Sequence, residues 1–107
     1  MTTFDDRERA FETQYARDQE LQFKVAARRN RLLGQWAAEK MRLSDVEAEA
    51  YAKEVIRADF EEAGDEDVVR KLVGDLTAAG VDVTDADVRR QLAEKAVEAR
   101  RHFIEGV

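Results

Sequence analysis

The longest stretch of helix-forming sequence lies at the N-terminal end of the chain. From Asp5 to Lys40 the only residue that disfavours a helix is Gly34, and one internal glycine costs a helix about 1 kcal/mol. Thirty-six residues at a rise of 1.5 Å each span about 54 Å. The chain has no proline and is rich in Ala, Glu, Arg, Leu and Lys, as long helices are. These features predict an all-α fold with one helix much longer than the others.

The rest of the sequence contains start and stop signals for three shorter helices. Ser44 and Glu47 form a capping-box pattern, which predicts a helix that runs to Ala63 and stops at Gly64. Acidic residues at 65–67 then begin a helix that ends at Gly80. Thr84, followed by Asp87, begins the last helix. A chain of 107 residues has room for one domain, so we predict a four-helix bundle.

The first helix is too long for the bundle that the other three define, which is roughly 20–30 Å long. Its hydrophobic seam is apolar through Tyr15, polar at Asp18 and Gln22, and apolar again from Val25. Local charge also changes sign there: residues 1–19 have five acids and three bases, whereas residues 20–42 have two acids and six bases. We therefore predict a projecting, partly disordered N-terminal helical arm (residues 1–19) on a four-helix bundle (residues 20–107).

Aromatic side chains form a stripe on this arm. Phe4, Phe11 and Tyr15 lie within about 40° of one another on a helical wheel. The stripe could pack on the chain's own bundle. Alternatively, it could enter a hydrophobic groove of a partner protein, with the neighbouring charges fixing the register. The density of aromatic residues near a chain end favours a partner-binding role.

A basic edge follows the arm, formed by Lys24, Arg28 and Arg31 at helical spacing. It could be a solvated face paired with the acidic second helix. It could also bind a nucleotide, although no glycine-rich phosphate loop accompanies it. Arg29 points toward the apolar side, and we predict that it pairs with Asp59 or Glu62 on the second helix.

Composition argues against catalysis and metal binding. The chain has no cysteine and a single histidine, His102, which we expect to interact with the end of the last helix. The acidic run 59–67 superficially resembles a calcium loop, but Arg70 stands where the bidentate glutamate should be. We therefore predict a protein that is not an enzyme and has no cofactor.

The N-terminal sequence and the hydropathy suggest a cytoplasmic location, and the net charge bears on the partner. A formal charge of −6 argues against nucleic acid as a partner. No signal peptide is visible, and no apolar run approaches the roughly 18 residues that direct membrane insertion requires.

Three segments resemble one family in order along the chain. They are Thr2 to Ala10 (TTFDDRERA), Ala27 to Ala38 (ARRNRLLGQWAA) and Asp59 to Val68 (DFEEAGDEDV). Each is similar to the zeta subunit of alphaproteobacterial F-type ATP synthases, and length and segment order agree. The segment from Met41 to Tyr51 departs from the family pattern because it lacks a glycine-containing turn.

The resemblance implies a four-helix bundle whose N-terminal segment inhibits ATP hydrolysis. That segment would insert at a catalytic interface between the α and β subunits, near the γ subunit, while the protein stays peripheral to the membrane-bound enzyme. The candidate partner-binding residues are Phe4, Asp5, Asp6, Arg7, Glu8, Phe11 and Tyr15. Two alternatives stay open: a regulatory module that binds ATP or ADP weakly through the basic edge, and a structural assembly factor of the same complex.

Overall fold

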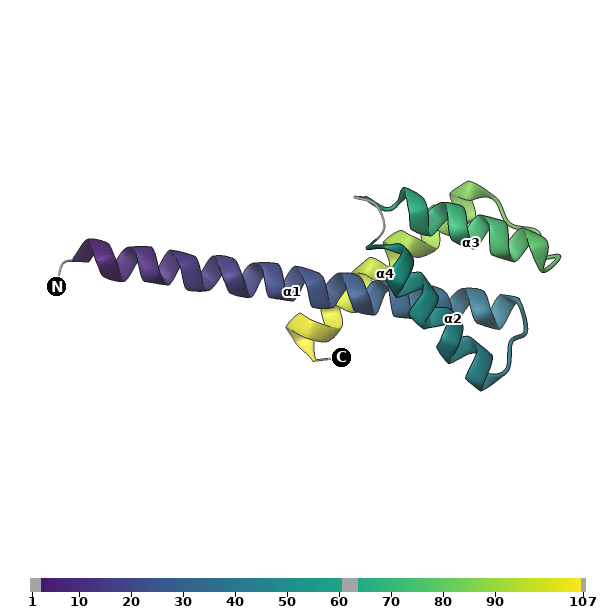
Figure 1. The fold of residues 1–107 in the computed structure, drawn as a ribbon, viewed down its shortest axis with the longest axis horizontal. Coiled ribbons are helices and arrows are strands. Elements are labelled where there is room, and N and C mark those ends of the chain that lie inside the picture. Colours follow the sequence, from purple (N-terminus) through teal and green to yellow (C-terminus); the bar gives the residue numbers. More distant parts are fainter. Residues whose placement is uncertain (1–2, 61–63, 107) are drawn as a thin grey trace.

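A computed structural model describes residues 3–60 and 64–106, with side chains from residue 17 onward. Within these ranges the chain forms four helices and no strand: α1 (Thr3–Lys40), α2 (Asp45–Ala58), α3 (Glu66–Ala78) and α4 (Asp85–Glu105). Helix α1 runs along the long axis of the molecule, and the other three gather around its C-terminal half (Figure 1). The molecule measures 65 × 27 × 22 Å. The predicted all-α fold with one long helix is confirmed.

The starts of α2 and α4 follow the predicted caps. The Ser44 hydroxyl accepts from the Glu47 backbone N–H at 3.2 Å, and the Glu47 carboxylate accepts from the Ser44 N–H at 3.1 Å. Thr84 and Asp87 repeat this reciprocal pair at 3.1 and 2.9 Å. The backbone donors lower the pKa of both Glu47 and Asp87 because they stabilise the charged carboxylates.

Helices α1 and α3 both end in a Schellman motif. In α3, Gly80 has a φ of +82°, and the N–H groups of Gly80 and Val81 donate to Thr77 and Leu76 at 3.0 and 2.9 Å. In α1, Arg42 takes the same position with a φ of +59°. The predicted stop at Gly80 is confirmed. The turn after α1 has the left-handed conformation typical of glycine, although the residue there is Arg42.

The predicted end of α2 is wrong. This helix ends at Ala58 rather than at Ala63. The Phe60 N–H donates to the Arg57 carbonyl at 3.1 Å, which tightens the last turn, and the Asp59 carboxylate is bound by Arg29 of α1. Gly64 has a φ of +91° but begins the segment that leads into α3.

The core lies between the C-terminal half of α1 and the other three helices. Its fully buried members include Leu33, Val55, Leu72, Leu76 and Val88. The predicted hydrophobic seam of α1 continues from Val25 to Leu32 and Trp36, and these three residues are only half-buried. The buried face of α1 is wider than the seam because α2 and α4 both pack against it extensively.

Helices α1 and α2 approach each other closely at Gly34. A Cβ atom at this position would lie 2.8 Å from the Cα of Ala52, a distance that real side chains do not tolerate. The absence of a side chain at Gly34 therefore sets the spacing of the two helices.

Among the residues that the structure describes, no helix combines the length and apolar character needed to cross a bilayer.

Candidate partner-binding surface

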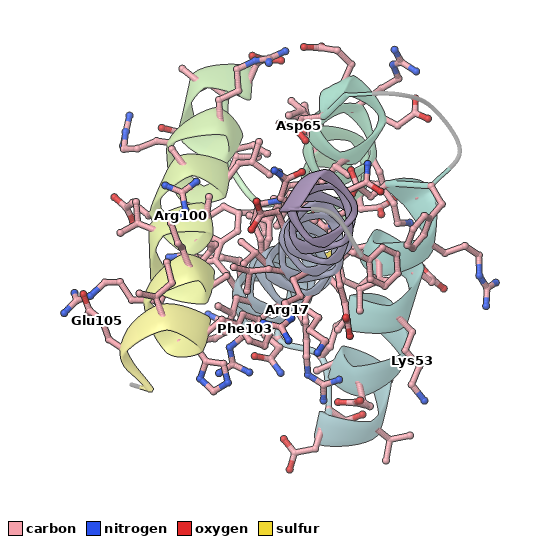
Figure 2. All side chains as sticks on the ribbon, turned by 90° about the vertical axis from the view of Figure 1, so that its left-hand side faces the viewer. Arg17, Lys53, Asp65, Arg100, Phe103 and Glu105 are labelled. Carbon is pink, nitrogen blue, oxygen red and sulfur yellow. The ribbon has the colours of Figure 1, made fainter. Side chains whose placement is uncertain are left out.

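The N-terminal half of α1 projects beyond the other helices (Figure 1). All side chains from Arg17 to Lys24 are exposed, burial begins at Val25, and Asn30 is the first side chain on the described part of α1 to be fully buried. Seen along α1 from its N-terminal end, α2, α3 and α4 lie around the helix (Figure 2). We call this projecting N-terminal half of α1, up to Lys24, the overhang.

The predicted partner-binding residues lie on the helical backbone of this overhang. Phe4, Phe11 and Tyr15 all belong to α1, as do the charged residues predicted beside them. Their side chains lie outside the described residues, so their roles stay predictions.

The three residues of the basic edge make different contacts from one another. Lys24 pairs with Glu20 at 3.2 Å, and Arg31 pairs with Glu49 of α2 at 2.9 Å. Arg28 lies against α4 in a groove of about 350 Å³ that Glu98 and Arg101 also line. Its buried Nε atom has no hydrogen-bond partner among the described residues. Lys24 and Arg31 are thus each engaged in an ion pair, and nucleotide binding stays a prediction.

Arg29 joins three segments of the fold. Its Nη2 atom donates to Asp59 at 3.4 Å, and its Nη1 atom lies 3.1 Å from Asp65, just before α3. The Nε and Nη2 atoms also donate to the Asn30 side-chain oxygen at 3.1 and 3.0 Å. The predicted pairing of Arg29 with Asp59 is confirmed. Glu62, the other predicted partner, lies outside the described residues.

A second polar cluster joins α2 to α3. The Tyr51 hydroxyl donates to Asp75 at 2.8 Å, and burial together with the Asp75 carboxylate raises the pKa of Tyr51. Lys71 bonds to Asp75 at 3.0 Å and to Glu54 at 3.3 Å, and its ammonium lies 5.1 Å from the centre of the Tyr51 ring. All of these partners come from within the bundle, so the cluster fixes how α2 packs on α3.

The single histidine lies at the end of the last helix. His102 belongs to the last turn of α4, with its ring edge-on to Phe103 at 5.0 Å. Across the part of the chain that the structure describes, no group of three acidic, histidine or cysteine side chains is placed to hold a metal ion.

An exposed aromatic pair at the base of the overhang was not predicted. The rings of Phe23 on α1 and Phe60 after α2 lie 5.5 Å apart. Phe23 falls off the hydrophobic seam, and Phe60 lies inside the acidic run, so neither stood out as a candidate. The sequence does contain a signal for Phe23, because a large aromatic residue on a polar helix face is unusual and can mark a binding surface.

The geometry defines the class of protein as a helical bundle that carries one projecting helix. The sequence profile of the ATPase inhibitor subunit zeta family matches residues 1–102. The chain therefore belongs to the family of zeta subunits, inhibitors of the F-type ATP synthase and not catalytic enzymes. Membership in this family implies binding to that synthase.

Comparison with solved structures supports the fold. A structure solved by NMR in solution is 45% identical to this chain, covers 81% of it and 99% of its own length, and superposes with a TM-score of 0.71. A comparison with curated protein sequences gives no match.

Proposed function

We propose that this chain inhibits ATP hydrolysis by inserting its N-terminal arm, residues 1–19, at a catalytic interface between the α and β subunits of the synthase. The arm would act as a wedge that resists closure of the interface during hydrolysis, near the rotating γ subunit. The observation that carries the proposal is the overhang, because its exposed side chains from Arg17 to Lys24 leave the helix surface available to a partner.

The sequence of the arm supports this mode of binding. Phe4, Phe11 and Tyr15 recur at a helical spacing typical of anchors that enter a hydrophobic groove. Aromatic anchors usually contribute much of the binding free energy in such complexes. The flanking residues Asp5, Asp6, Arg7 and Glu8 would fix the register.

The test is an ATPase assay on the cognate catalytic head. Full-length protein should inhibit hydrolysis, whereas a chain lacking residues 1–19, and a full-length chain with all three aromatic anchors replaced by serine, should not. Circular dichroism of each variant checks that the bundle remains folded. Undiminished inhibition by both variants would contradict the wedge mechanism and favour binding through the bundle, as expected of an assembly factor.

A nucleotide-binding role has one observation in its favour, the buried and unpaired Nε atom of Arg28 beside Arg101. Titration with ATP or ADP, followed through backbone amide shifts, tests it. Localised shifts around Arg28 at millimolar nucleotide would support this role, and their absence would remove it.

A further inference from the structure

Two aromatic rings at the base of the overhang are largely exposed to solvent. Phe23 is 55% exposed and Phe60 is 61% exposed, although their rings contact each other. Packing within the bundle does not account for such exposure, because phenylalanine gains most when it is fully buried. Exposed aromatic side chains that are fixed in place are typical of the energetically important centre of a protein interface.

The fold holds this aromatic pair in place. Arg29 binds Asp59, the residue before Phe60, and Asp65, which lies on the other side of the α2–α3 connection. The Arg29 side chain is only 13% exposed, and the fully buried Asn30 orients it. A mostly buried ionic contact of this kind adds little net stability, but it fixes where Phe60 lies against Phe23.

Charge around the pair indicates what kind of surface it fits. Residues 59–67 include six acidic residues and no basic one. Within the described part of this run, four carboxylates pair with only three arginines, so carboxylates remain in excess: Asp59, Asp65, Glu66 and Asp67 against Arg29, Arg70 and Arg89. A complementary surface would therefore have an apolar pocket with basic side chains on its rim.

The pair is also close to the arm. Phe23 lies on α1 four residues after Gln19, the last residue of the arm, which is about 6 Å along the helix axis. A protein that holds the arm would therefore come within reach of both rings.

We propose that Phe23 and Phe60 form a second docking contact, which inserts into an apolar, basic-rimmed pocket on the same synthase surface that receives the arm. This inference rests on the proposed function and adds a contact outside the arm. The arm would block the catalytic interface, and the aromatic pair would hold the bundle beside it.

Alanine substitution of each ring in the full-length chain tests this contact. Phe23→Ala and Phe60→Ala should each raise the concentration needed for half-maximal inhibition by about tenfold, with inhibition at saturation unchanged. Val46→Ala is the matched control: Val46 is 81% exposed and lies in the first turn of α2, at the opposite end of that helix from Phe60. Unchanged half-maximal concentrations in both ring variants would overturn the proposal.

If either alanine variant unfolds, photo-crosslinking tests the docking contact instead. A benzophenone amino acid at position 60 keeps an aromatic ring there and should crosslink to the catalytic head, whereas the same group at position 46 should not. Absence of a crosslink from position 60 would overturn the proposal.

The two proposals fail in different ways. If the arm-substituted chain still inhibits while position 60 crosslinks, the wedge mechanism is wrong and the docking contact stands. If the arm variants lose inhibition while both ring variants behave as the unmodified chain does, the docking contact is wrong and the wedge mechanism stands.

Discussion

Arg42 and Gly80 occupy equivalent positions at the ends of two helices. Both have a positive φ and lie in a Schellman motif with the same backbone hydrogen bonds. For a residue with a Cβ atom this left-handed conformation costs roughly 1–2 kcal/mol, whereas glycine adopts it freely. The turn between α1 and α2 therefore carries conformational strain that the turn after α3 does not.

Arg42→Gly should stabilise the protein. The expected gain in unfolding free energy is about 0.5–1 kcal/mol, because relief of the left-handed strain exceeds the extra entropy that glycine gives the unfolded chain. Chemical denaturation measures this gain. The reciprocal change Gly80→Ala serves as the control and should destabilise by about 1 kcal/mol. A loss of stability in Arg42→Gly would show that the arginine side chain contributes more than its backbone conformation costs.

Single residues also show where sequence reasoning succeeds and where it stops. Both capping boxes are predictable because Ser44 with Glu47, and Thr84 with Asp87, bond within one helical turn. The contact of Phe60 with Phe23 is not, because it depends on how the α2–α3 connection packs against α1. Arg29 is an intermediate case: its direction on the helix predicts a partner on α2, but Asp65 becomes a second partner only once α3 is in place.

At the scale of whole helices, the close crossing of α1 and α2 depends on Gly34, which has no side chain. The sequence identifies Gly34 only as a weak point in a long helix. The structure shows a different role, because a Cβ atom at this position would lie only 2.8 Å from the Cα atom of Ala52. The close approach to a partner helix could not be predicted from local sequence.

Gly34→Ala should therefore destabilise the bundle despite alanine's higher helix propensity. Overpacking costs about 1–3 kcal/mol and the propensity gain is about 1 kcal/mol, so we expect a net loss of up to about 2 kcal/mol. Thermal or chemical denaturation measures it. Gly74→Ala is the matched control, because a Cβ atom at Gly74 in α3 would meet no other atom within 4 Å, and this change should stabilise by about 1 kcal/mol. Equal stabilisation by both changes would contradict the close approach.

At the scale of the whole molecule, α1 belongs to two environments. Its side chains from Arg17 to Lys24 are exposed, whereas Leu33, Ala37 and Ala38 are fully buried. A helix without tertiary contacts is marginally stable in water, and local opening is easiest where few apolar contacts hold the backbone. The stability of α1 should therefore differ along its length.

Amide hydrogen exchange tests this difference. Amides of residues 17–24 should exchange much faster than those of residues 33–38, by a factor of about a hundred or more, and their protection should rise when the catalytic head is added. Exchange is followed residue by residue by NMR, and Leu72 in α3 provides a fully buried reference. Equal protection along the whole of α1 would show that the overhang is stable without a partner.

The continuity of α1 has one further consequence. A helix with its side chains is about 10–12 Å wide, whereas the molecule measures 27 × 22 Å across its two shorter axes. A cleft that admits one helix would exclude the bundle. Contact between the bundle and the rim of the cleft would therefore limit how far α1 can enter. The number of residues in the overhang would then set how far the inhibitor reaches, and adding or removing one heptad would shift that reach by about 10 Å.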